Sequence, residues 1–256
     1  MIYITGDCHR DYRRFGMQAF PEQKEMTKDD YVMICGDFGY WDLSRETDYW
    51  MKWLDNKSYT TLWIDGNHEN YDLLKELPVE EWHGGKVQKV NQSVIHLMRG
   101  QVYELDGLKI FTFGGARSHD IEGGILDLKD PAYRRKKSRL MKSKRFFRTI
   151  HVNWRPEEMP DEEEYEEGTR NLEKADWKVD LVLTHCCATS LQKKAFGEGD
   201  YVSDQLTDYL EMLRNRLDYC YWLFGHYHEN RQLTEKDYVL YEQIVRLPDR
   251  EGADKG

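Results

Sequence analysis

The segment MIYITGDCH, residues 1–9, decides the fold, because it joins a short apolar run to a polar cluster. Met1 to Thr5 has the length and the β-branched and aromatic content of a buried strand. Asp7 and His9 follow directly, and residues two apart in an extended segment point the same way. This segment therefore predicts a strand whose carboxyl end directs a carboxylate and an imidazole at one site.

The same pattern recurs four times along the chain. The apolar runs 31–35, 61–64, 181–183 and 221–224 end in Gly36-Asp37, Asp65-Gly66-Asn67-His68, Thr184-His185 and Gly225-His226-Tyr227-His228. Helical patterns at 46–54 and 203–217 lie between them, and alternating strands and helices are typical of an α/β fold. Because ligands bind at the carboxyl ends of strands in such folds, we expect the five polar clusters to share one rim.

Three further runs, 94–97, 101–105 and 108–113, predict strands, with a turn at Asp106-Gly107. The region 117–176 breaks this rhythm. Its segment 134–148 holds nine Lys and Arg residues, and its segment 157–167 is densely acidic. We expect one domain over residues 1–256, in which 117–176 is a charged surface insertion carrying one or two helices.

The basic segment 134–148 has two interpretations. A run of Lys and Arg can follow a nucleic-acid backbone or a polyphosphate, and Phe146 and Phe147 at its end could stack on a base. The interpretation we favour is a solvated helix that pairs with the acidic segment 157–167, because the two runs are close in sequence and opposite in sign.

Composition restricts the class of protein. The 256 residues carry a formal net charge of −10, with 39% hydrophobic and 33% charged residues, which is typical of a soluble globular protein. An acidic chain is by default a poor binder of nucleic acid. No apolar run approaches the ~20 residues of a membrane span, so we expect no membrane association. The five cysteines include no CxxC pair and the chain opens as a strand, so we expect a cytoplasmic location.

The polar clusters offer a mixed set of oxygen and nitrogen ligands. They are Asp7, His9, Asp37, Asn67, His185, His226 and His228. A single histidine after a strand is usually structural, but the repetition of the pattern favours a metal site. The set suits Mn, Fe, Zn, Co or Ni better than Ca or Mg, and Mn is the metal we favour. Seven ligands exceed the needs of one tetrahedral ion, so we expect two divalent ions ~3.5–4 Å apart.

The ordered motifs are Gly6-Asp7-Cys8-His9, Gly36-Asp37, Gly66-Asn67-His68-Glu69, Thr184-His185 and Gly225-His226-Tyr227-His228. In this combination they resemble the motifs of the calcineurin-like metallophosphoesterase superfamily. The resemblance spans nearly the whole chain, with 117–176 outside it. It implies a four-layer α/β/β/α sandwich of two mixed sheets.

The resemblance also implies a role for each residue. Asp7, His9 and His228 would hold the first ion, Asn67, His185 and His226 would complete the second, and Asp37 would bridge both. His68 would face the substrate and protonate or stabilise the leaving oxygen. The implied reaction is hydrolysis of a phosphodiester or phosphomonoester by a hydroxide that bridges the two metals.

Three residues are candidates for substrate binding. Arg117 and His119 follow a predicted strand, and Arg117 could clamp a phosphate oxygen with His119 assisting. The alternative for Arg117 is a surface ion pair with a neighbouring acid. Arg10, beside the first ligand loop, is another candidate clamp. A nucleotide or a nucleic acid is among the candidate phosphate esters, and the oligomeric state stays open.

Two other functions are weaker alternatives. The Ser/Thr phosphatase branch has a glycine where Arg10 stands and an Arg-Gly shortly after the second Asp, where this chain reads Phe38-Gly39-Tyr40-Trp41. A phosphoprotein phosphatase is therefore less favoured. A non-catalytic interaction module of the same fold usually lacks the catalytic histidine or several ligands, and this chain retains all of them.

Overall fold

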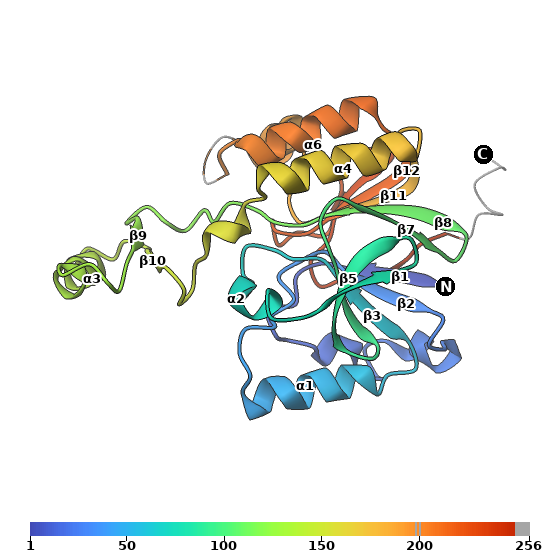
Figure 1. Ribbon diagram of the computed structural model, residues 1–256, viewed down its shortest axis with the longest axis horizontal. Helices are drawn as coiled ribbons and strands as arrows, with labels where there is room; N and C mark the ends of the chain where they lie inside the picture. The colour runs from blue at the N-terminus through green and yellow to red at the C-terminus, as the bar shows by residue number, and fades with distance from the viewer. Residues whose placement is uncertain (198, 200, 249–256) are drawn as a thin grey trace.

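Two mixed β-sheets stacked face to face form the centre of the protein (Figure 1). The computed structural model describes residues 1–197, 199 and 201–248, so the last eight residues of the expected domain lie outside the described part. Helix α1 (Arg45–Asp55) covers the outer face of one sheet, and α4 (Glu162–Lys174) and α6 (Gln205–Arg216) cover the outer face of the other (Figure 1). This arrangement confirms the predicted four-layer sandwich.

The first sheet has seven strands in the order β15-β1-β2-β3-β6-β5-β4. They are β1 (Ile2–Thr5), β2 (Tyr31–Ile34), β3 (Thr60–Trp63), β4 (Val79–Trp82), β5 (Gly85–Asn91), β6 (Val94–Leu97) and β15 (Val245–Arg246). The four strands β1, β2, β3 and β6 are parallel, and every residue in them is buried. Their continuous apolar character follows, because parallel strands are covered on both faces.

The second sheet has six strands in the order β13-β14-β12-β11-β8-β7. They are β7 (Gln101–Leu105), β8 (Leu108–Phe113), β11 (Lys178–Thr184), β12 (Asp218–Phe224), β13 (Arg231–Gln232) and β14 (Asp237–Val239). The strands β8, β11, β12 and β14 are parallel. The hairpin β7–β8 turns at Asp106 and Gly107, which both have positive φ (52° and 75°), as a two-residue hairpin turn requires.

The remaining helices are short. They are α2 (Tyr71–Leu74), α3 (Tyr133–Lys142) and α5 (Thr189–Phe196), with 3₁₀ turns at Arg13–Phe15, Pro21–Glu25 and Pro156–Glu158. Capping boxes begin α4 at Asp161 and α6 at Asp204, where each carboxylate accepts the N–H of the third helical residue. Among the described helices, not one combines the length and the apolar character that crossing a membrane requires.

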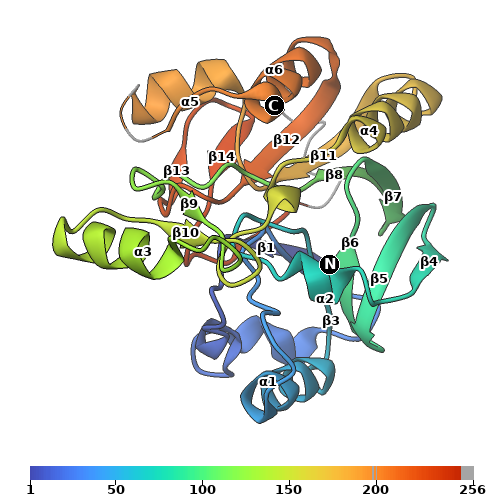
Figure 2. The same cartoon turned by 60° about the vertical axis from the view of Figure 1, so that its left-hand side comes forward.

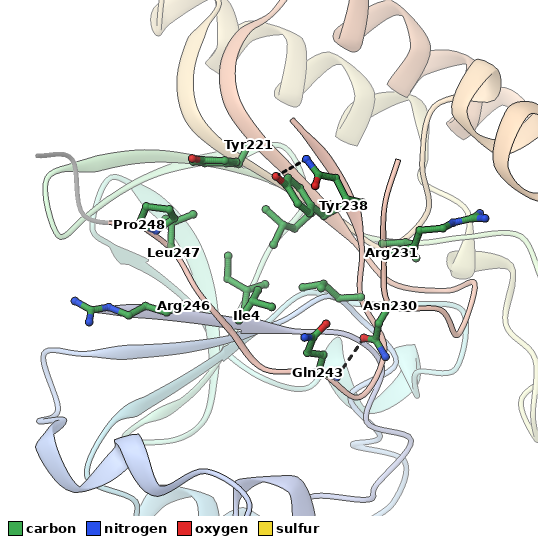
Figure 3. Close-up of a pocket in the computed structure, with 14 residues that line it drawn as sticks. Ile4, Tyr221, Asn230, Arg231, Tyr238, Gln243, Arg246, Leu247 and Pro248 are labelled. Atoms are coloured by element: carbon green, nitrogen blue, oxygen red, sulfur yellow. Dashed lines mark hydrogen bonds between the residues drawn. The ribbon is translucent and has the colours of Figure 1, made fainter. Parts of the chain in front are cut away.

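The core between the two sheets is aliphatic. Ile4 and Leu62 from the first sheet pack with Leu181, Leu183 and Leu223 from the second, and all are almost fully buried. A pocket of about 380 Å³ opens beside β14 and β15, and its lining is mostly apolar (Figure 3). None of the predicted site residues lines this pocket.

The region 117–176 contributes to two parts of the structure. The short strands β9 (Ile125–Leu126) and β10 (Arg148–Thr149) pair in parallel and, with α3, project from the sandwich (Figures 1 and 2). Helix α4, in contrast, packs on the six-stranded sheet beside β7. The treatment of 117–176 as one insertion within a single domain stays a prediction.

The basic and acidic segments do not pair with each other among the described residues. The acidic side chains Glu157, Glu164 and Glu167 pair instead with Lys75, Arg99 and Lys86 of the sandwich. In the basic segment, Lys136 pairs with Asp130 and Arg148 pairs with Asp120. The structure confirms the solvated helix, since α3 has no buried residue, but the expected ion pairs with the acidic segment are not found in the described part of the chain. Because α4 packs on the sheet, Glu164 and Glu167 face the body of the protein, whereas its other carboxylates are exposed and α3 extends away from the sandwich (Figure 1).

Candidate metal centre

The polar clusters that follow β1, β2, β3, β11 and β12 meet at one edge of the sandwich. Asp7 and Asp37 come from the seven-stranded sheet, and His185 and His226 come from the six-stranded sheet. His185 Nε2 lies 3.4 Å from Asp37 Oδ1. The backbone N–H of His226 donates to Asp7 Oδ1 at 2.9 Å. Segments separated by more than 200 residues thus share one buried centre, as the common rim of parallel strands predicts.

The backbone is strained where these side chains converge. His9, Asp37, His226 and His228 all have positive φ, between 45° and 68°. Such conformations are unfavourable for residues with a Cβ and concentrate at functional sites. The loops also approach very closely, since a Cβ on Gly66 would lie 2.1 Å from Asp37 Oδ1. The surrounding sheets hold these loops in place at a cost in backbone energy.

Asp7, His9 and His228 form a first group of potential ligands. Their ligand atoms all lie within 4.8 Å of one another. His228 Nε2 is 3.1 Å from Asp7 Oδ2 and 3.0 Å from His9 Nε2. Asp7 Oδ2 is buried and makes no well-aligned hydrogen bond, although the imidazole nitrogens of His228 and His9 lie 3.1 and 3.6 Å away. A cation among these atoms would satisfy it, so the residues present fit a metal ion.

A second group surrounds His185. Asp7, Asp37 and His185 also place ligand atoms within 4.8 Å of one another. His185 Nδ1 lies 2.6 Å from the carbonyl of Cys35, which can only accept, so the proton is on Nδ1. Nε2 then faces Asn67 Oδ1 at 3.2 Å. A histidine whose other nitrogen donates to a carbonyl is the usual arrangement of a metal ligand.

Charges at the centre complement one another. Burial raises the pKa of Asp37, but the charges of His185 and His68 hold it well below its usual range. Burial lowers the pKa of His185, but Asp37 and Asp7 raise it to about 10. Burial and the His185 charge keep the pKa of His226 well below its usual value. The two carboxylates are therefore anionic, and a cation at His185 Nε2 would replace the second proton of the ring, while Nδ1 keeps its proton on the Cys35 carbonyl.

His68 lies at the edge of this centre. Its backbone N–H donates to Asp37 Oδ1 at 2.8 Å, and its carbonyl accepts from Trp41 Nε1 at 2.5 Å. Its ring lies 5.3 Å from that of His9, and its Nε2 lies 3.3 Å from Arg148 Nη2. Arg148 also donates from Nε to Asp120 Oδ1 at 2.8 Å. The sequence did not single out Arg148, because it stands at the end of a long basic run.

The three predicted substrate-binding residues lie in different surroundings. His119 places its ring 5.7 Å from that of His226 and 4.9 Å from that of Tyr201. Arg117 is exposed, and together with His119 and His226 it lines a small pocket of about 90 Å³. Arg10 turns away and donates to Asp42 at 3.2 Å and to Thr47 at 2.9 Å.

Buried polar contacts hold the loop that carries Asn67 and His68. Asp65, at its start, accepts from Arg99 Nε at 2.8 Å and Nη2 at 2.5 Å. Glu69, at its end, accepts the backbone N–H of Phe38 at 2.6 Å. Glu69 thereby ties this loop to the loop of Asp37.

Comparison with known proteins places this geometry in context. The sequence profile of the calcineurin-like phosphoesterase family matches residues 1–230. Lariat debranching enzyme A of Xenopus laevis is 27% identical over 140 residues, which cover 48% of this chain and 25% of that protein. The chain thus spans only about a quarter of that relative. The crystal structure of the phosphopantetheinyl hydrolase of Mycobacterium tuberculosis aligns over 94% of this chain and 87% of its own, with 14% identity and a TM-score of 0.45.

Proposed function

Because this chain belongs to the calcineurin-like phosphoesterase family, we propose that it is a metal-dependent hydrolase of phosphodiesters or phosphomonoesters. The observation that carries the proposal is the buried centre in which Asp7, Asp37 and His185 meet beside His68. Anionic oxygens and imidazoles at this spacing are suited to divalent cations.

We assign the ligands as follows. One cation would be held by Asp7, His9 and His228, a second would be held by Asn67, His185 and His226, and Asp37 would be a ligand for either. The mixed donor set suits Mn, Fe, Zn, Co or Ni, with Mn favoured. When bound, two such cations lower the pKa of water and offset phosphoryl charge, which is the chemistry that hydrolysis of a phosphate ester needs.

The chain itself supplies orientation and a polar ring at the leaving oxygen. The backbone N–H of His68 donates to Asp37, and its Nε2 accepts from Arg148. Burial and the charge of Arg148 lower the pKa of His68, although Asp37 opposes them, so we assign the neutral ring to stabilise the leaving oxygen. His119 and Arg117, beside His226, are assigned to the substrate. All five cysteines are free thiols, which supports a reducing compartment such as the cytoplasm.

Hydrolysis of bis-p-nitrophenyl phosphate and p-nitrophenyl phosphate, with added Mn, tests the proposal. We expect His68→Ala and Asp37→Asn each to lower kcat by about 10²-fold or more, since each removes a group that acts on the reacting ester. His83→Ala is the matched control, because His83 is exposed on the β4–β5 turn. Wild-type rates in both site variants would refute the assignment.

A further inference from the structure

A basic arm, residues 120–150, projects from the sandwich beside the candidate site (Figures 1 and 2). Its helix α3 carries six cations in ten residues, none of them buried: Arg134, Arg135, Lys136, Lys137, Arg139 and Lys142. The sequence contains no acidic residue between Asp130 and Glu157. A chain with a net charge of −10 therefore concentrates positive charge on one protruding element.

Most of this charge has no ion-pair partner in the part of the chain that the structure describes. Lys136 pairs with Asp130, but among the described residues no ion pair involves Arg134, Arg135, Arg139 or Lys142. Arg135 and Arg139 are four residues apart on one helix, a spacing at which like charges repel. The arm is thus arranged for an external polyanion, because nothing else described in the chain neutralises it.

The arm also leads directly into the candidate site. Its strands β9 and β10 pair at its base, and Arg148 on β10 lies 3.3 Å from His68. His119, which precedes the arm, places its ring 5.7 Å from that of His226. A polyanion lying along the arm would therefore meet a site suited to phosphate esters. Nucleic acid is both a polyanion and a phosphate ester.

Two observations narrow the partner further. Phe146, at the arm's base, is 65% exposed, which suits stacking on an unpaired base. Helix α3 holds only Leu140 and Met141 as aliphatic residues, so it lacks the wide apolar face of a helix that lies in a membrane surface.

We propose that the basic arm binds single-stranded nucleic acid and guides its backbone to the site beside His68. This inference rests on the proposed function and names its substrate class. A ten-residue helix is about 15 Å long, enough to follow several phosphates. Each phosphate contact on a single strand contributes about 0.7 to the slope of log K against log salt concentration.

Fluorescence anisotropy with fluorescein-labelled dT₂₀ and rU₂₀, in EDTA to prevent cleavage, tests the inference. The test variant combines R134Q, R135Q, R139Q and K142Q. The matched control combines K109Q, R170Q, K174Q and K178Q, which removes the same charge from exposed positions on the second sheet and α4. Both variants are also assayed on bis-p-nitrophenyl phosphate with Mn, which is too small to use the arm.

We expect the arm variant to bind oligonucleotide at least about tenfold more weakly at 0.1 M salt, with a salt slope reduced by about 3. The control should match wild type, and both variants should hydrolyse the small ester normally. Phe146→Ala, a second and independent variant, should weaken binding without changing the slope, since stacking releases no counterions.

Three results would each overturn the inference. The first is that wild type binds no oligonucleotide, and the second is that the arm variant binds it as tightly as wild type does. The third is arm-dependent binding to anionic phosphatidylglycerol vesicles alone. Hydrolysis of the small ester separates the two proposals. If wild type hydrolyses it but binds no oligonucleotide, only the arm assignment fails; if it binds through the arm but hydrolyses nothing, only the proposed activity fails.

Discussion

Replacement of Arg99 by leucine should destabilise the protein strongly, because it strands a buried carboxylate. Arg99 and Asp65 have side-chain exposures of 4% and 2%, and they share two hydrogen bonds of 2.8 and 2.5 Å. Arg99 also pairs with Glu164 at 2.8 Å. Removing one partner of a buried ion pair costs about 3–5 kcal/mol. At about 2–4 °C per kcal/mol for a chain of this size, Tm should fall by roughly 6–20 °C.

The pH dependence gives this loss a distinctive signature. Burial raises the pKa of Asp65, but Arg99 and His96 hold it well below its usual range. The stability that a depressed carboxyl pKa contributes is present above the unfolded pKa of about 3.9 and is lost as pH falls through the folded value. The difference in Tm between wild type and Arg99→Leu should therefore be fully present at pH 7 and should become smaller below about pH 4.

Differential scanning calorimetry across this pH range provides the measurement. Arg170→Leu is the control, because Arg170 and Glu166 form an exposed pair on α4 worth at most about 0.5 kcal/mol. Asp65→Asn combined with Arg99→Leu should recover part of the loss, since it removes the stranded charge. A Tm within 2 °C of wild type at pH 7, or a gap that widens below pH 4, would refute this reasoning.

Three other outcomes are expected. Burial raises the pKa of Glu158 to about 7, although hydrogen bonds from Ser118 oppose this shift. The stability that protonated Glu158 contributes to the folded protein is therefore fully present below about pH 4.5 and is lost as pH rises through 7. Glu158→Gln should therefore gain roughly 3 kcal/mol over wild type between those limits in urea titrations, and parallel pH profiles would argue against it. Removal of metal by EDTA should lower Tm by about 5–10 °C and Mn should restore it; an unchanged melt would count against bound metal. Gly66→Ala should abolish Mn binding in calorimetric titration, because its Cβ would lie 2.1 Å from Asp37 Oδ1. Gly199→Ala is the control and should bind Mn normally, because no atom lies within 4 Å of the added Cβ. Mn binding by Gly66→Ala would contradict the geometry.

Continuous apolar runs made the central strands predictable. β6, β7 and β8 have the predicted limits, β1 and β2 differ by one residue at one end, and β3 is shifted by one residue at both ends. β11 extends to Lys178, three residues before the predicted start, because Lys178 and Asp180 interrupt the apolar pattern outside the core. The hairpin of β4 and β5 was missed, since β4 reads VEEW and is largely exposed at the sheet edge. Edge strands carry little hydrophobic signal, so pattern alone does not reveal them.

Some residues of the candidate site were also predictable from the sequence, and others were not. Asp7, Asp37 and His185 were predictable because each directly follows a strand, and the structure brings them together. Their metal-binding roles stay a proposal. Arg148 and Tyr201 were not predictable, because each reaches the site from a segment without a motif. The solvated helix of the basic segment was predictable, but its pairing with the acidic segment is not found among the described residues, since proximity in sequence does not fix which side chains of α4 meet the sandwich.

Anomalous X-ray diffraction from crystals grown with MnCl₂ would test the central claim most directly. We expect two manganese peaks ~3.5–4 Å apart with the Asp37 carboxylate between them. One peak should lie within bonding distance of Asp7, His9 and His228, and the other within bonding distance of Asn67, His185 and His226. A map with no anomalous peak at these side chains, or with manganese bound only elsewhere, would contradict the claim that the strand ends form a metal centre.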